Sequence, residues 1–375
     1  MRRVQPLSIR AVRIALGGFV WMLVMRTGFV RAQANEARLE RVVDAWASRQ
    51  ERVKSFDVAA RGTWWMKLSP GFGLAPGADP QKLFPRPPSD TTYVAEVRLT
   101  TDVRGRVRDE FDQIWWAVPD GLLGVFRPHK VISIDDGKAY TDFFDVGGGV
   151  PIPNCFIYNR GKEGRGRISH MRNFAIRMVY RPFDEMGTVV RSKLKVAEEN
   201  ALWDGRRTVV LQHADELIWV DPEREYLPVR YQMSKSNPSR RIIEFSYKED
   251  DIGDWVLASW KDDYAGGFRF TATMEVTSFS VNQGLPDELF AISLPPGTWV
   301  HDETTGESYI DHGTRKRHVG PGEFNGLNYK DLVERDEPQA WWWPNPLFVL
   351  GNLALILGSA AALYFIRRWR SHAAS

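Results

Sequence analysis

The densest group of side chains that could bind a metal ion lies near the C-terminal end of the chain. Its candidate ligands are His301, Asp302, Asp311 and His312, with Glu303 and His318 close by. Imidazole nitrogens and carboxylate oxygens are ligands that zinc and related divalent ions accept. They could meet if the segment folded as a hairpin about Thr304-Thr305-Gly306. Exposed hairpins are often this polar without a metal, so the sequence predicts no resident metal or other cofactor.

Catalytic sequence motifs are missing from the chain. It contains no Gly-x-Ser-x-Gly, no His-Glu-x-x-His and no Gly-x-x-x-x-Gly-Lys-Ser/Thr pattern. Gly161–Arg167 is glycine-rich and basic, but its lysine is followed by no hydroxyl residue. The single Cys155 rules out an internal disulfide and a multi-cysteine metal site. We therefore expect no enzymatic activity. An envelope hydrolase, the third alternative, would need titratable side chains that converge in a cleft.

The elements that must position any binding residues begin with an amphipathic helix. From Asn35 to Lys54, apolar side chains recur at helical spacing, with Asn35 as the N-cap; they are Leu39, Val42, Val43, Trp46 and Val53. The period then changes to two. From Tyr93 to Val107 the odd positions are mostly apolar and the even positions mostly charged, which predicts a strand or hairpin with one solvated face.

Strand patterns continue almost to the end of the chain. They cover Ser55–Lys67, Val131–Phe144, Lys193–Glu198, Arg207–Gln212, Glu216–Asp221, Pro228–Met233, Arg241–Tyr247, Trp255–Lys261, Phe268–Ser280 and Phe290–Leu294. Short turns such as Asp204-Gly205 separate them, so neighbouring strands should pair antiparallel. One internal helix is expected over Ile168–Tyr180. The loop Leu68–Asp90, with six prolines, is either a lid or binding loop or a surface insertion.

Both ends of the chain carry membrane-targeting patterns. Residues 1–34 combine arginines, an apolar run and the small-residue pattern Ala32-Gln33-Ala34, which predicts a signal peptide or, if uncleaved, a signal anchor. Near the other end, Leu347–Ile366 is a run of twenty uncharged, mostly apolar residues. As a helix it would span about 30 Å, which fits a membrane span better than a buried core helix. Tryptophans before it and arginines after it place the tail 367–375 in the cytoplasm.

The charge distribution argues against a nucleic-acid partner. The whole chain carries a net charge of +3, but six arginines lie within residues 1–34 and three follow Ile366. The part between them therefore carries −6, whereas binding to phosphates requires a basic face. We expect a mildly acidic ectodomain on the extracytoplasmic, periplasmic side of the membrane.

The order of the predicted elements resembles the LolA-like group. An amphipathic helix leads directly into a strand, and three later segments follow in the same order as in that group: the hairpin Ile134–Tyr140, the Asp-Pro hairpin Ile218–Val229 and the closing segment Leu289–Val300. The group contains periplasmic lipoprotein carriers, related lipoprotein-binding proteins and the sensor domain of RseB-type regulators. The resemblance covers roughly Asn35 to Asp302. It implies an α+β fold, a mainly antiparallel, incomplete β-barrel of about ten strands covered by a few helices.

The resemblance further implies that the concave, apolar face of the half-barrel binds acyl chains or a lipidated partner. Adjacent aromatic residues on a strand point to opposite faces, so one of each pair should line that face. Core packing is the commoner role of any single aromatic residue. The ligand-binding candidates are Trp64, Trp65, Phe72, Phe84, Val97, Leu99, Trp115, Trp116 and Trp219.

These expectations define a membrane-anchored, divergent member of the group. The predicted regions are a signal peptide (1–34), a half-barrel ectodomain (35–302), a polar juxtamembrane extension (303–343), a transmembrane helix (347–366) and a cytoplasmic tail (367–375). A tethered domain is fixed to one membrane, so we expect stationary, non-catalytic binding of an acyl chain, a lipoprotein or a hydrophobic partner segment. The alternative is an envelope docking or signalling scaffold with a packed interior and no small ligand.

Overall fold

A computed structural model describes residues 33–68, 91–117, 125–145, 153–159, 173–183, 189–233, 240–265, 268–320 and 323. The side chains of residues 91, 113–117, 125–129 and 268 lie outside this description. The chain forms two compact units. Unit 1 contains the residues up to Phe144 together with Asn159–Ile292, and unit 2 contains Asp145–Tyr158 together with the residues from Ser293 onward.

Unit 1 is built on a large, open, antiparallel β-sheet. Its spatial strand order is β5-β4-β3-β2-β1-β13-β12-β11-β10-β9-β8-β7. The bounds are β1 Phe56–Leu68, β2 Thr91–Thr101, β3 Val107–Ala117, β4 Val125–Asp135, β5 Ala139–Asp145, β7 Leu194–Trp203, β8 Arg206–His213, β9 Glu216–Asp221, β10 Leu227–Gln232, β11 Arg240–Glu249, β12 Trp255–Ala265 and β13 Phe268–Val281. Most neighbours in this order are also consecutive in sequence, and the long connection is the pairing of β1 with β13.

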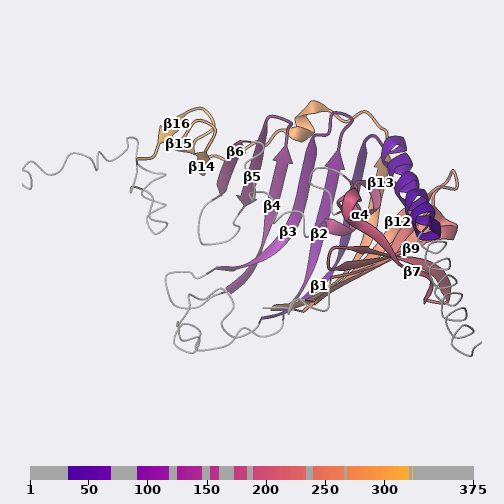
Figure 1. The fold of residues 1–375 in the computed structure, drawn as a ribbon. Coiled ribbons are helices and arrows are strands. Elements are labelled where there is room, and N and C mark those ends of the chain that lie inside the picture. Colours follow the sequence, from indigo (N-terminus) through magenta and orange to yellow (C-terminus); the bar gives the residue numbers. More distant parts are fainter. Residues whose placement is uncertain are drawn as a thin grey trace, which may run out of the picture. The chain divides into compact units, whose positions relative to one another are not determined.

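Two helices pack on one side of this sheet. Residues 33–52 are helical and bury Val42, Val43 and Trp46. The short helix α4, Phe174–Tyr180, has every residue after Phe174 buried. Both contribute to a single hydrophobic core with the strands. Figure 1 shows the indigo helix and α4 on the same side of the sheet, within its bend. We call this helix-covered side the inner face and the opposite side the outer face.

The alternation along β1 shows how the sequence selects the inner face. Phe56, Val58 and Trp64 are buried on it, while Arg61 between them is exposed on the outer face. Gly62 continues the inner series without a side chain. A Cβ added there would lie 1.9 Å from the carbonyl oxygen of Thr273 on β13, so the close approach of β1 and β13 requires glycine at this position.

Unit 2 contains a small sheet in the order β16-β15-β14-β6. Its strands are β6 Asn154–Asn159, β14 Thr298–Asp302, β15 Glu307–Asp311 and β16 Lys316–His318. β14 pairs parallel with β6 and antiparallel with β15. Cys155, Val300 and Ile310 are buried in it.

Most of the predicted elements are confirmed. The first helix, β1, the hairpin of β2 and β3, the hairpin of β4 and β5, and the series from β7 to β13 occur where the periodicity places them. The described residues contain more strands than the predicted ten, because β6 and β16 were not predicted and the hairpin of β14 and β15 was considered only as a possible metal site. Within the predicted helix Ile168–Tyr180, only residues from Phe174 onward are described as helix.

The predicted strand Phe290–Leu294 is wrong. Asp287–Phe290 forms a short 3-10 helix after Pro286, and residues 291–294 pair with no strand. The carbonyl oxygens of Leu289 and Ala291 instead accept hydrogen bonds from the Arg108 side chain, at 2.9 and 3.1 Å. A side chain thus takes the place of a strand neighbour.

The predicted membrane segments lie outside the described residues. This applies to residues 1–32 of the signal sequence and to the span Leu347–Ile366. Among the helices that the structure describes, none is both long enough and apolar enough to cross a bilayer.

Candidate ligand-binding face

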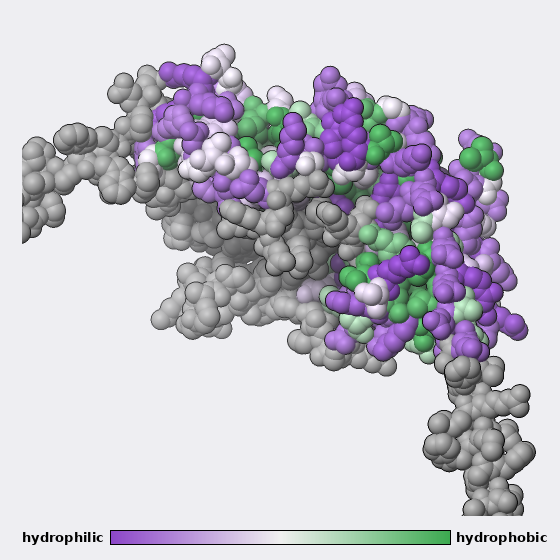
Figure 2. Space-filling view, turned by 45° about the horizontal axis from the view of Figure 1, so that its top comes forward, coloured by the Kyte–Doolittle hydropathy of each residue, from purple (hydrophilic) through white to green (hydrophobic). Residues whose placement is uncertain are grey.

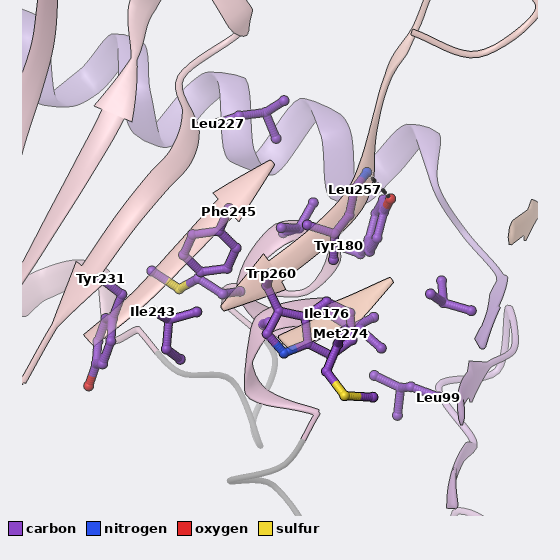
Figure 3. Packing of buried hydrophobic residues seen from close by; sticks show 14 of the residues in the cluster. Leu99, Ile176, Tyr180, Leu227, Tyr231, Ile243, Phe245, Leu257, Trp260 and Met274 are labelled. Atoms are coloured by element: carbon purple, nitrogen blue, oxygen red, sulfur yellow. Dashed lines mark hydrogen bonds between the residues drawn. The ribbon is translucent and has the colours of Figure 1, made fainter. Parts of the chain in front are cut away.

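The inner face of unit 1 carries a continuous apolar surface. Figure 3 shows Ile176 of α4 close to Trp260 and Met274, with Leu99 beside them. Leu99, Ile176 and Met274 are completely buried. The surface is therefore covered by α4 in this structure. On the side of the molecule seen in Figure 2, apolar residues lie in several groups, each bordered by hydrophilic ones.

Three of the predicted ligand-binding residues lie together on the inner face. They are Trp64, Val97 and Leu99, all of them buried. The Trp64 ring stacks on Phe270 with 5.1 Å between ring centroids, and its indole Nε1 donates a hydrogen bond to Met274 Sδ at 3.1 Å. The alternation argument predicted a common face for Val97 and Leu99, and for the pair Trp64-Trp65 it predicted one residue on the inner face without saying which.

Two other candidates point to the outer face. Trp65 follows Trp64 on β1 and lies near the Arg269 guanidinium, 5.9 Å from the ring centroid. Trp219 lies 6.4 Å from Trp203, and Arg230 packs against both rings. The residues on either side of Trp219 form the part of the inner face that β9 contributes. Trp65 and Trp219 therefore belong to a different surface from Trp64.

The remaining four candidates cannot be placed. Phe72 and Phe84 lie outside the described residues. Trp115 and Trp116 belong to β3, where only the backbone is described.

Helix α4 crosses the inner face from the β10 side to the β1 side. At its start, Phe174 packs on Tyr231 of β10 with 4.6 Å between centroids. At its end, Tyr180 packs on Phe56 of β1 at 5.4 Å and accepts a hydrogen bond from the backbone N–H of Leu257 at 3.1 Å. Burial raises the pKa of Tyr180 above its usual value. Aromatic contacts thus hold α4 at both of its ends.

A tightly paired arginine lies on the inner face beside the start of α4. Arg241 of β11 and Asp262 of β12 are both buried. The Arg241 Nη2 and Nε atoms donate to the Asp262 carboxylate at 2.7 and 3.1 Å. The Arg241 guanidinium also lies over the Phe174 ring, 5.1 Å from its centroid. One edge of this guanidinium is therefore filled by a carboxylate of matching geometry.

A second buried arginine belongs to α4 itself and is paired much more loosely. Arg177 is 2% exposed, and its Nη2 atom lies 3.7 Å from Asp109 Oδ2 on β3. Asn173, which precedes α4, is completely buried and donates from its Nδ2 atom to Asp109 Oδ1. The Nε and Nη2 atoms of Arg177 and the Oδ1 atom of Asn173 are buried without a hydrogen-bond partner.

The polar row continues from Asp109 across the next two strands. Asp109 pairs in register with Ser133 of β4, and the Ser133 hydroxyl donates to Asp142 Oδ1 of β5 at 2.5 Å. Desolvation raises the pKa of Asp142 to about 6, although hydrogen bonds from Ser133 and Tyr140 oppose the shift. The row is an acidic border to the apolar surface.

The first helix is fastened to the turn that follows β9. Both Arg49 and Arg52 donate to Glu225 Oε2, at 2.9 and 2.8 Å, and the Trp46 indole N–H donates to the carbonyl oxygen of Tyr226 at 2.7 Å. The hydrogen bond from Arg52 is the main reason that the pKa of Glu225 lies below its usual value, and burial opposes it. These contacts keep the helix on the inner face.

The metal-ligand candidates form the expected hairpin but do not converge. His301 Nδ1 contacts Ser308 Oγ at 2.8 Å, while Asp302 Oδ1 accepts from the Thr304 N–H at 2.8 Å and so caps the turn. Asp311 lies opposite Thr298, at the other end of the strand pair from Asp302. Within the described part of the chain, no three His, Cys, Asp or Glu side chains gather as a metal site would require.

The buried polar residues of the inner face were missed in the sequence, although two of them leave a signal. Asp109 lies between Val107 and Phe111, at a position where the two-residue period calls for an apolar side chain. Arg177 lies among the apolar residues of α4. A charged residue at a position where the period calls for an apolar one predicts a buried charge, but it does not identify the partner of that charge.

No family model matches the sequence, and no curated protein matches it. Solved structures similar to the chain include a domain assigned to an outer-membrane lipoprotein-sorting protein from Vibrio parahaemolyticus. It is 10% identical with a TM-score of 0.38, and the match covers 69% of this chain and 97% of that one. A LolA-superfamily protein from Nitrosomonas europaea is 11% identical with a TM-score of 0.33, covering 66% and 97%. The names of these two structures agree with the resemblance predicted from the sequence, and neither match carries information on a ligand.

Proposed function

We propose that unit 1 is a non-catalytic binding domain that holds an acyl chain, or the acylated part of a lipoprotein, on its inner face. The observation that carries the proposal is the kind of helix that covers the apolar surface. A seven-residue helix closes a continuous apolar surface, and its buried Arg177 has two N–H groups without hydrogen-bond partners. Unsatisfied buried groups lower the stability of the closed arrangement, which makes displacement of α4 by a ligand less costly.

The apolar surface has the chemistry that an acyl chain needs. Ile176, Met178 and Tyr180 of α4 are buried against the strands, and the same strand positions would contact a chain if the helix moved. Burying apolar surface contributes about 0.8 kcal/mol for each methylene group. A chain of ten or more carbons could therefore replace the packing of a single helical turn.

We further propose that the domain is tethered to a membrane and faces the periplasmic side. The support comes from the sequence of Leu347–Ile366 and from the arginines that follow it. A tethered domain would receive or present its ligand at that membrane.

Photo-crosslinking tests the proposed site without changing the protein. The purified full chain is incubated with a fatty acid that carries a diazirine near the end of its chain, irradiated and digested, and the labelled positions are mapped by tandem mass spectrometry. Labels are expected on inner-face residues of β2 such as Val97 and Leu99. Val94, 54% exposed on the outer face of the same strand, is the internal control. Labels spread equally over both faces would contradict a specific site.

The alternative function is a docking or signalling scaffold that takes no small ligand. The complete burial of Leu99 and Ile176 favours it, because a fully packed interior needs no occupant. In that case the diazirine probe would label no inner-face residue at any concentration below its micelle limit.

A further inference from the structure

The polar atoms around Asp109 show which ligand group the inner face could recognise. Arg177 and Asn173 are one helical turn apart and contact the two oxygens of the same carboxylate. The Nε and Nη2 atoms of Arg177 lie on one edge of the planar guanidinium, and in Arg241 that edge is bound by Asp262. In Arg177 neither atom has a hydrogen-bond partner, and neither has Asn173 Oδ1.

These atoms form a set of two donors and one acceptor. A buried polar group without a partner destabilises the folded protein, because it has lost its hydrogen bonds to water. Three of them on two neighbouring side chains form a concentrated defect in an otherwise apolar region. A ligand would remove it if one group accepted hydrogen bonds from Arg177 and donated one to Asn173.

We infer that this cluster binds the amide group of an amide-linked acyl chain. An amide carbonyl oxygen has two lone pairs for the Arg177 edge, and the amide N–H can donate to Asn173 Oδ1. The acyl chain would then extend over the apolar surface beside Leu99, where it would displace the part of α4 that follows Arg177 while Asn173 and Arg177 stay beside Asp109. This inference rests on the proposed function and specifies the ligand class of the same face.

The charges around the cluster exclude an ionic head group. Arg177 already faces Asp109 at 3.7 Å, and the row beyond it contains Asp142, so a carboxylate or phosphate would meet like charges in a desolvated place. A cationic head group would meet the guanidinium. An ester accepts hydrogen bonds but donates none, and it would leave Asn173 Oδ1 unsatisfied.

A ligand series tests the inference on the unmodified full chain. Competition with a fluorescent acyl probe compares N-methyldecanamide, N,N-dimethyldecanamide, methyl decanoate, decanol and decanoate, each corrected for its partition into the detergent. N-methyldecanamide should bind about tenfold more tightly than the dimethyl amide and the ester, because only it supplies the N–H. Equal binding of decanol, or tighter binding of decanoate, would overturn the amide assignment.

Two variants test whether Arg177 is the residue that binds the ligand. Arg177→Met should weaken the binding of N-methyldecanamide and of methyl decanoate alike, because both present a carbonyl oxygen to Arg177. Arg230→Met, on the outer face, should leave the whole series unchanged. If all compounds bind equally to the unmodified chain, the cluster holds water rather than an amide, and the inference fails while the proposed function stands. If no compound displaces the probe or the probe does not bind, the proposed function itself fails. Should Arg177→Met not fold, the ligand series decides alone.

Discussion

Two buried arginines at the inner face of unit 1, one on a strand and one on the covering helix, differ in how they are paired. Arg241 presents the Nε and Nη2 edge of its guanidinium to Asp262 at hydrogen-bond distances. Arg177 presents nothing closer than 3.7 Å to Asp109, and the same two atoms are unpartnered. The first pair joins neighbouring strands of the sheet, whereas the second joins a short covering helix to the sheet.

The difference separates an ion pair with good hydrogen-bond geometry from one that leaves buried donor atoms without partners. A buried charge costs several kcal/mol in lost hydration, which good geometry can offset. Arg241 has that geometry, and strand pairing fixes it, because Arg241 and Asp262 lie on adjacent strands. Arg177 lacks that geometry, so the free-energy cost of burying its charge is not fully offset while α4 covers the sheet. We expect that cost to be recovered when a ligand binds.

The largest expected effect comes from breaking the tight pair. Arg241→Met leaves Asp262 buried without its partner and should lower the free energy of unfolding by about 3–5 kcal/mol. Urea unfolding followed by tryptophan fluorescence measures this. Arg230→Met on the outer face, where Arg230 packs between Trp203 and Trp219, is the control and should cost less. A loss below 1 kcal/mol at Arg241 would remove the contrast between the two arginines.

A smaller effect is expected at Asp142, in the acidic row beside Arg177. Because its folded pKa of about 6 exceeds its ordinary value of 3.8, the folded protein binds a proton that the unfolded chain releases between these pH values. Stability should therefore fall as pH rises from about 4 to about 6. Asp142→Asn should abolish this fall and stabilise the protein at pH 7.5 by on the order of 2 kcal/mol.

Unfolding curves of both proteins across pH 4–8 measure the effect of Asp142→Asn. The two proteins should converge near pH 4, where the carboxyl is protonated in the folded state. A constant difference at all pH values would show that the substitution acts through packing and not through the proton.

The smallest effect is expected when the loose pair is neutralised. Arg177→Met combined with Asp109→Asn removes both buried charges and the unpartnered N–H groups, so the free energy of unfolding should change by about 1 kcal/mol or less. The same exchange at the tight pair, Arg241→Met with Asp262→Asn, is the matched comparison and should cost more. An equal loss at both pairs would mean that Arg177 is as structural as Arg241.

The hydrophobic periodicity and the turn residues of the sequence were enough to predict most helices and strands of unit 1. Alternation predicted that Val97 and Leu99 share a face and that one of Trp64 and Trp65 lies on the inner face, because one side of each strand is buried. The strand predicted over Phe290–Leu294 is wrong. Alternation cannot reveal that the Arg108 side chain donates hydrogen bonds to carbonyl oxygens that a neighbouring strand would otherwise bind. Local sequence patterns contain no information on such distant contacts.

The polar cluster could not be predicted for the same reason. Asn173 and Asp109 are separated by 64 positions and meet only because α4 lies across β3. The sequence showed charges at apolar positions, but the quality of their pairing depends on side-chain distances in the folded protein. The difference between Arg241 and Arg177 is therefore visible only in the structure.

Identification of a co-purified ligand tests the central claim most directly. The full chain is expressed so that it reaches the membrane, purified in a detergent without acyl chains and extracted with organic solvent, and the extract is quantified by mass spectrometry. We predict close to one acyl-bearing molecule per protein, reduced in a chain in which Leu99→Trp fills the inner face and retained when Val94→Trp changes the outer face. A protein that is empty, and that also takes up no fluorescent fatty acid, would contradict the account and favour the packed scaffold.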